Sequence, residues 1–175
     1  HVGTDRLRNI VANIKTYLIN HGADIMFDSK LTDLTLKNNK VSSIIINNQT
    51  ELECDYLVLG LGNAARDTFE LLNNKNIAIE QKPISVGVRV EHHQDTINNY
   101  IYGKYKNDRY LKPAELSLTY KDSETGRGVY SFCMCPGGYV VNASSEENRL
   151  AINGMSYNKR DSGISNSAIV VTVTP

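Results

Sequence analysis

Residues 55–62 are Asp55-Tyr56-Leu57-Val58-Leu59-Gly60-Leu61-Gly62, and this stretch decides the predicted fold class. The continuous apolar run in it is typical of a strand buried on both faces of a parallel sheet. The glycines end that strand, and a helix is predicted over residues 64–72 directly afterwards. A buried strand, a glycine turn and a helix in this order predict an α/β domain, in which ligands bind at the carboxyl ends of strands.

Upstream of this stretch the sequence predicts a helix and a small antiparallel sheet. Apolar residues recur at steps of three and four over residues 5–20, which is typical of an amphipathic helix. Four short β-prone segments follow, at residues 24–28, 31–36, 41–47 and 51–54. Asn38-Asn39 and Asn47-Asn48 separate the last three, and asparagine tolerates the positive φ that tight hairpin turns require. We therefore expect one strand that leads into a β-meander.

Downstream, Pro83 is the expected domain boundary, so that residues 1–82 form one domain and residues 83–175 the other. The second domain is expected to be mostly β, hence α+β, with a short helix over residues 94–100. Its strands are expected at residues 84–91, 116–120, 128–135, 137–142 and 169–174. Residues 142–146 and 154–156 are polar and turn-forming, and we expect loops there.

Composition excludes several classes of protein. The 175 residues carry 19 basic and 19 acidic side chains, and this balance argues against a nucleic-acid partner. No apolar run approaches the ~20 residues that a membrane-spanning helix needs. Three cysteines do not suggest a disulfide framework, so a reducing cytoplasm is expected. Because the chain starts almost at a helix and stops on a strand, we expect an internal piece of a longer protein.

The turn Gly60-Leu61-Gly62 has two interpretations. Its backbone N–H groups could approach a phosphate at the start of the following helix, or it could be a plain tight turn. No GxGxxG motif occurs, so a self-contained dinucleotide fold is not expected. Arg66 falls in the first turn of that helix, where a cation is disfavoured unless an anion is nearby. The alternative for Arg66 is a surface pair with Asp67 or Glu70.

Cys133-Met134-Cys135-Pro136-Gly137-Gly138 is the most unusual string in the chain. Regular strand alternation would put Cys133 and Cys135 on one face, about 6.6 Å apart. Metal binding, redox-active thiols and buried structural thiols are the three interpretations, and no metal is predicted because too few further ligands exist. We expect the turn Pro136-Gly137-Gly138 to let backbone approach a ligand closely. The pair His92-His93 is expected at a solvated strand end.

Several segments together resemble a family of bacterial flavoproteins, namely uncharacterised FAD-dependent dehydrogenases or oxidoreductases. The resemblance extends over essentially the whole chain, and the Cys-Met-Cys-Pro-Gly-Gly string is its most specific part. The segments are His1-Val2-Gly3-Thr4-Asp5-Arg6-Leu7, residues 59–68, Lys82-Pro83, residues 87–92, residues 126–142, Ala143-Ser144-Ser145-Glu146 and Asn153-Gly154-Met155-Ser156-Tyr157.

The resemblance implies a two-domain flavoprotein of the glutathione-reductase type. This chain would be its middle, without the N-terminal GxGxxG unit and the C-terminal segment that closes the flavin site. Residues 1–82 would then be a partial FAD/NAD(P)-binding Rossmann-like domain, and residues 83–175 an incomplete substrate domain. The open edge beside residues 56–59 would let the chain self-associate.

The resemblance also implies the site residues. Those expected at the cofactor are Leu31, Gly60, Leu61, Gly62, Arg66, Pro136, Gly137 and Gly138. Those expected to face the substrate are Cys133, Cys135, Arg89 and Arg160. The family commonly has His-Ser-Ala-Arg-Asp over residues 63–67, where this chain keeps Arg66 but has Asn63 and Ala64. No catalytic acid or base is predicted.

The function that follows is that of an FAD-dependent oxidoreductase acting on a small molecule, with NAD(P)H as a candidate electron donor. The flavin would carry the redox chemistry and the protein would bind and orient. Two alternatives remain at this point: a flavoprotein that acts in RNA modification, and a non-catalytic nucleotide-binding module. No membrane partner is expected.

Overall fold

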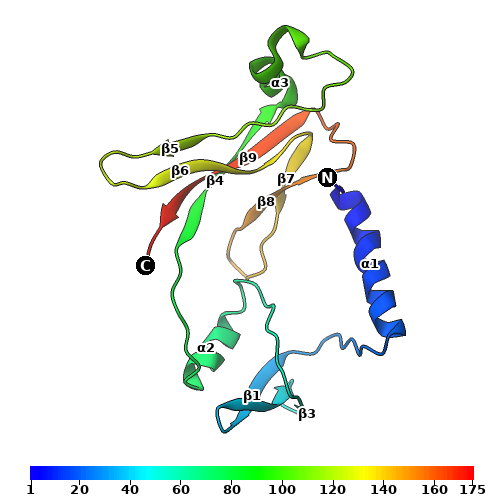
Figure 1. The fold of residues 1–175 in the computed structure, drawn as a ribbon, viewed down its shortest axis with the longest axis vertical. Coiled ribbons are helices and arrows are strands. Elements are labelled where there is room, and N and C mark those ends of the chain that lie inside the picture. Colours follow the sequence, from blue (N-terminus) through cyan, green and yellow to red (C-terminus); the bar gives the residue numbers. More distant parts are fainter. The chain divides into compact units, whose positions relative to one another are not determined.

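The structure is a computed structural model that describes residues 1–175, and the chain divides into two compact units (Figure 1). One unit comprises residues 19–81, and the other comprises residues 1–18 with residues 82–175. All strand pairs in the three sheets are antiparallel. The fold is therefore α+β, and the expected Rossmann-like arrangement with a parallel sheet is not formed.

The structure has four helices, one of them a 3-10 helix, and nine strands. The helices are α1 (Thr4–Asn20), α2 (Arg66–Asn74), α3 (Gln94–Tyr102) and the 3-10 helix η1 (Gly103–Tyr105). The strands are β1 (Leu31–Lys37), β2 (Lys40–Ile46), β3 (Thr50–Glu53), β4 (Ile84–His93), β5 (Thr119–Lys121), β6 (Gly128–Cys135), β7 (Gly138–Asn142), β8 (Ile152–Ser156) and β9 (Ile164–Val173).

The β-meander in the unit of residues 19–81 confirms the prediction from the asparagine pairs. Its strand order is β1-β2-β3. Asn38 and Asn39 have φ angles of 52° and 59°, and Asn47 and Asn48 have 53° and 57°. Both central residues of each turn thus take the left-handed conformation that a type I′ hairpin needs. Leu34, in β1, is only 1% exposed and lies in the core of this small sheet.

The predicted buried strand at residues 55–62 is wrong. These residues form no strand, and the side chains of Tyr56 and Val58 are 90% and 92% exposed. A strand that is apolar on both faces needs hydrogen-bonded neighbours and covering layers, and the described residues supply neither. Residues 24–28, also predicted as a strand, are irregular as well.

The main sheet of the other unit has the order β4-β9-β6-β5. β9 lies between β4 and β6 (Figure 1) and pairs with β4 from Ile84↔Val173 to His93↔Ile164. The predictions for strands at 84–91 and 128–135 and for the short helix after β4 are confirmed. β9 is longer than predicted, because its first half carries polar residues that are buried, such as Ser165 and Asn166.

The second sheet of this unit is the hairpin β7–β8. The prediction of a loop at residues 154–156 is wrong, because Gly154 lies inside β8 and pairs with Val140 of β7. Glycine and polar residues lowered the strand signal of this segment. Strand β8 packs closely against β6 and β9 at Gly154, and a larger residue at this position would prevent that packing.

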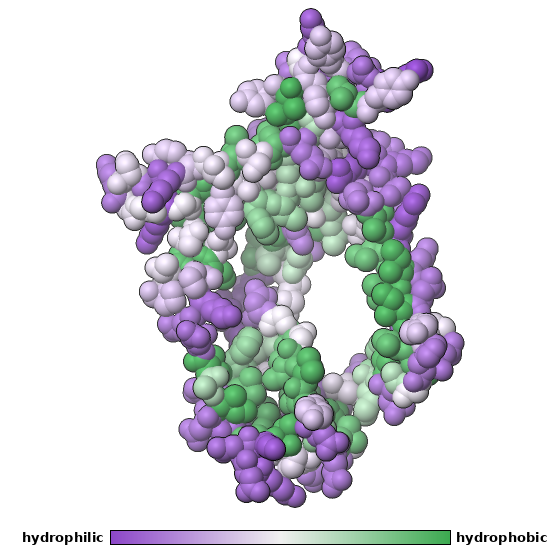
Figure 2. All heavy atoms as spheres, in the orientation of Figure 1, coloured by the Kyte–Doolittle hydropathy of each residue, from purple (hydrophilic) through white to green (hydrophobic).

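Helix α1 confirms the predicted amphipathic helix. No residue of α1 is buried. Figure 2 shows hydrophobic residues gathered along one side of α1 and hydrophilic ones along the other. Val11 and Ile14 on the apolar side are 58% and 53% exposed, so this stripe covers no sheet within its own unit. None of the helices is long and apolar enough to cross a membrane.

Candidate functional site

Two of the cofactor residues predicted in the unit of residues 19–81, Leu31 and Arg66, have neighbours in the chain that contact each other. Leu31 begins β1 and Arg66 begins α2. Their neighbours Lys30 and Asp67 form an ion pair of 2.5 Å, which ties the start of the strand to the start of the helix. The side chain of Lys30 holds the pKa of Asp67 below its ordinary value, and the backbone N–H of Thr68 adds to this effect.

The turn Gly60-Leu61-Gly62 precedes α2 and has open surroundings. A Cβ at Gly60 or at Gly62 would have no atom within 4 Å. Gly62 has a φ of 72°, which favours glycine, whereas Gly60 has no such backbone requirement. The packing of this chain therefore does not explain a glycine at position 60.

In the other unit, several segments that carry the resemblance meet at one cavity of about 310 Å³. We call it the thiol cavity, because two cysteines lie in its wall. It is lined by His1, Val2, Gly3, Thr4, Leu7, Cys133, Met134, Cys135, Gly154, Met155, Ser156 and Arg160. The N-terminal segment, the end of β6 and strand β8 are far apart in the sequence, and the fold brings them together here.

The N-terminal wall of the thiol cavity is fixed by the turn after β8. Asn158 donates from Nδ2 to the carbonyl oxygen of Val2 at 2.9 Å, and from its backbone N–H to Oδ1 of Asp5 at 2.9 Å. Nε2 of His1 is 3.0 Å from the carbonyl oxygen of Tyr157. Gly3 has a φ of 87°, and a Cβ there would come within 2.2 Å of the backbone nitrogen of Asn158. Only glycine fits at this position.

Arg89, on β4, holds the end of β6 in place. Its Nη1 donates to Oδ1 of Asn166 at 2.6 Å and to the carbonyl oxygen of Cys133 at 3.3 Å. Gly154 packs directly over this group: a Cβ there would lie 2.3 Å from Nη1 of Arg89 and 2.8 Å from Sγ of Cys135. Arg89 forms no salt bridge with a carboxylate, so its charge faces neutral acceptors and a thiol.

The two cysteines differ in exposure. The pairing of β6 with β9 is irregular between Phe132 and Cys135, and Cys133 has a φ of 49°. The regular alternation expected from the sequence is therefore wrong here: a bulge leaves Cys133 exposed and Cys135 buried, although both line the thiol cavity. Burial and the neighbouring Cys133 thiol raise the pKa of Cys135, and Arg89 partly offsets this rise.

The turn Pro136-Gly137-Gly138 is fully buried within its own unit. The backbone N–H of Gly137 donates to Oε1 of Gln94 at 2.9 Å. Gly137 has a φ of 55°, and a Cβ there would come within 1.8 Å of the carbonyl oxygen of Arg160. The chain itself thus explains glycine at position 137 without a ligand, and the assignment of this turn to the cofactor stays a prediction.

The guanidinium of Arg160 has a partner at Nη1 but none at Nε. Its Nη1 forms an ion pair with Oε1 of Glu115 at 2.6 Å. Its Nε is buried and has no hydrogen-bond partner, and the same holds for Nδ2 of Asn166. Such donors are costly to leave unpaired, so they mark places where a ligand or water would be bound.

A family model described as "FAD-dependent protein, C-terminal domain-like" matches residues 83–175, more than half of the chain. The chain belongs to this family of FAD-dependent proteins. An uncharacterised protein of Clostridium beijerinckii is 47% identical over 175 residues, which are 100% of this chain and 33% of that relative. The chain thus spans one third of the length of this relative.

Family membership confirms the flavoprotein part of the resemblance at a coarse level. The glutathione-reductase-type plan and the division into domains of stated function stay predictions. No group of three or more His, Cys, Asp and Glu side chains is arranged to hold a metal ion. The prediction that Cys133 and Cys135 bind no metal awaits a direct measurement.

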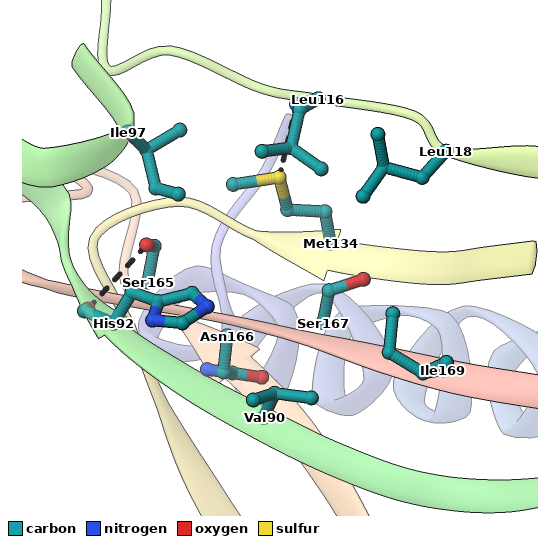
Figure 3. Close-up of a pocket in the computed structure, with 10 residues that line it drawn as sticks. All are labelled: Val90, His92, Ile97, Leu116, Leu118, Met134, Ser165, Asn166, Ser167 and Ile169. Atoms are coloured by element: carbon teal, nitrogen blue, oxygen red, sulfur yellow. Dashed lines mark hydrogen bonds between the residues drawn. The ribbon is translucent and has the colours of Figure 1, made fainter. Parts of the chain in front are cut away.

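A second cavity of this FAD-dependent protein, of about 300 Å³, is mainly apolar (Figure 3). Figure 3 shows the side chains of Leu118 and Met134 across the cavity from those of Val90 and Ile169. His92 also lines it and is exposed, in agreement with the solvated strand end that the sequence predicts. Sδ of Met134 accepts the backbone N–H of Leu116 at 3.1 Å.

Three residues important for the thiol cavity were missed in the sequence. Gln94 anchors Gly137, Asn166 accepts from Arg89, and Gly154 allows the close approach of β8. Glycine inside a strand is a known sign of close backbone approach, so Gly154 could have been found once β8 was recognised. The two amides carry no comparable signal, because their importance depends on partners 43 and 77 residues away.

Proposed function

We propose that this protein is an FAD-dependent oxidoreductase and that the thiol cavity is its site for a small-molecule substrate. The proposal rests on one observation. In this member of an FAD-dependent family, the N-terminal segment, the end of β6 and strand β8 come together at that cavity. A cytoplasmic location and NAD(P)H as electron donor are part of the same proposal.

The unit of residues 19–81 fits a contribution to the FAD site. Leu31, Gly60, Leu61, Gly62 and Arg66 would hold the cofactor. Open space next to Gly60 and Gly62 and the N-terminus of α2 are features that suit a large anionic group. When bound, FAD supplies the two-electron chemistry that no side chain can provide.

On the substrate side, this chain offers cations and thiols. Arg89 and Arg160 would orient an anionic or polar group of the substrate, and the buried Nε of Arg160 is a donor without a partner. The hydrogen bonds from Arg89 to Asn166 and to the end of β6 keep this wall rigid, which an oriented substrate requires.

The experiment is a spectroscopic titration of the full-length protein. We expect flavin absorbance near ~450 nm that bleaches when NADH or NADPH is added without oxygen, because the isoalloxazine accepts the electrons. The same titration on Arg160→Met tests the substrate side. Its flavin should still bleach with NADH or NADPH, but turnover of the small-molecule substrate should fall. A flavin that no physiological donor reduces would contradict the oxidoreductase proposal.

A further inference from the structure

The thiol cavity holds two sulfur atoms with different access to solvent. Cys133 is exposed on the bulge, whereas Cys135 is 9% exposed behind it. The Sγ of Cys135 is 3.5 Å from the carbonyl oxygen of Cys133, and burial together with the neighbouring Cys133 thiol raises the pKa of Cys135. An outer and an inner thiol in one cavity are the arrangement that a stepwise exchange of sulfur bonds needs.

We propose that Cys133 and Cys135 form a dithiol pair that reduces a small disulfide bound in the thiol cavity. Cys133 is the attacking residue because a substrate can reach it. Cys135 is the resolving residue because it is screened from solvent and lies next to Cys133. Cys54, the third cysteine of the chain, does not line the thiol cavity and takes no part in the proposed reaction.

The reaction balances without any further oxidant. The thiolate of Cys133 attacks one sulfur of R–S–S–R, the S–S bond breaks, and one R–S⁻ leaves and takes up a proton. The thiolate of Cys135 then attacks the sulfur of Cys133 and expels the second R–S⁻. Two thiols lose two electrons and two protons, and the substrate becomes two molecules of R–SH.

The surroundings favour this order of events. The guanidinium of Arg89 lies near Cys135 and attracts its thiolate, which lowers the pKa of that thiol. Two effects work in the opposite direction: burial raises the pKa of Cys135 most, and repulsion by a Cys133 thiolate raises it further. Once Cys133 carries the substrate sulfur it no longer bears a charge, so Cys135 ionises more readily when its turn comes.

Arg89 is a positioning residue in this scheme. It holds the carbonyl oxygen of Cys133 and the side chain of Asn166 at the same time, and so fixes the bulge. Arg89→Lys keeps the charge but loses the fork of donors, whereas Arg89→Met loses both. We expect the attack of Cys135 on Cys133 to slow more in Arg89→Met than in Arg89→Lys, because only lysine keeps the positive charge. If Arg89 acted through its hydrogen bonds alone, the two variants would slow this step equally.

The inference rests on the proposed function only in taking the thiol cavity as the substrate site. The experiment uses the full-length protein, reduced and freed of reductant, with bis(2-hydroxyethyl) disulfide as the probe. Free thiols are blocked with N-ethylmaleimide at intervals, and the peptides are analysed by mass spectrometry. Flavin absorbance is recorded in the same samples, so that loss of flavin and loss of thiol exchange are seen separately.

The expected result is a Cys133–Cys135 disulfide and two molecules of 2-mercaptoethanol per chain. Cys135→Ser should stop with one mercaptoethanol bound at Cys133, and Cys133→Ser should react at least ~10-fold more slowly. Cys54→Ser is the matched control and should behave as the wild type. The inference is overturned if Cys54 reacts as fast as Cys133, or if the wild type never forms the internal disulfide. Thiol exchange in a protein without flavin would support the dithiol pair and contradict the oxidoreductase proposal.

Discussion

The two glycine turns of this protein, Gly60-Leu61-Gly62 and Pro136-Gly137-Gly138, look alike in sequence and differ in surroundings. The second is buried, and its Gly137 would meet the carbonyl oxygen of Arg160 at 1.8 Å if it carried a Cβ. The first is exposed, and a Cβ at Gly60 would meet nothing. Packing within the chain therefore explains one turn and not the other.

The difference shows what a glycine in a turn can mean. A glycine is required where φ is positive, where another atom lies too close for a Cβ, or where a ligand will lie. Gly137 satisfies the first two conditions, Gly154 only the second, and Gly60 neither. A ligand or another part of the protein would explain Gly60, and the proposed FAD site corresponds to the first of these. Substitutions at these positions separate the three conditions.

Gly137→Ala should have the largest effect on stability. The substitution combines a left-handed backbone with overlap against a rigid carbonyl group, so it should lower the free energy of unfolding by about 3–5 kcal/mol. Urea unfolding of the full-length protein measures the change. A loss below about 1 kcal/mol would mean that the turn is not packed against Arg160 as described.

Gly154→Ala should have a smaller effect, because φ at this position is not positive and the overlapping atoms belong to side chains. The side chains of Arg89 and Asn166, both 2.3 Å from that Cβ, must move aside, so we expect a loss of about 1–3 kcal/mol. The accompanying change is a faster reaction of Cys135 with N-ethylmaleimide, since the substitution pushes β8 away. Unchanged thiol reactivity would contradict the close packing of Gly154 on Cys135.

Asn39→Ala isolates the cost of the backbone conformation. Asn39 is exposed and has a φ of 59°, and alanine adds no atom that asparagine lacks. We expect a loss of about 1 kcal/mol, and Asn39→Gly should restore or exceed the wild-type stability. Equal stabilities of Asn39→Ala and Asn39→Gly would show that the hairpin changes its turn type.

The sequence allowed the local elements to be predicted but not all of their surroundings. The β-meander was predictable because Asn38-Asn39 and Asn47-Asn48 require a specific turn, which is a property of neighbouring residues. Strand β4 was predictable from its alternation. Residues 56–59 were misassigned, because a continuous apolar run indicates burial without saying which part of a protein provides it.

The thiol cavity was predictable only in part. Cys133, Cys135 and Arg89 were found as residues of interest, and they do lie together. Their arrangement was not foreseeable, since it depends on a bulge in β6 and on strand β8, whose Gly154 suggested a loop. Gln94 and Asn166 are common polar residues that become important only when the fold buries them.

Gly60→Ala should have the smallest effect on stability. With ordinary φ and open space, alanine should change the free energy of unfolding of the flavin-free protein by no more than about 0.5 kcal/mol. Urea unfolding beside Gly137→Ala gives the comparison directly. A large loss at Gly60 would mean that another part of the protein packs there, and the turn would then be structural in the same way as Gly137.

The FAD content of the full-length protein and of its Gly60→Val variant tests the central claim most directly. The account predicts one FAD per chain in the wild type, released on denaturation and identified by its absorbance. It predicts that Gly60→Val remains folded but retains little or no FAD, because its side chain fills the space beside the turn. A wild-type protein that stays colourless with excess FAD, or a Gly60→Val variant that binds FAD as well as the wild type, would contradict the account.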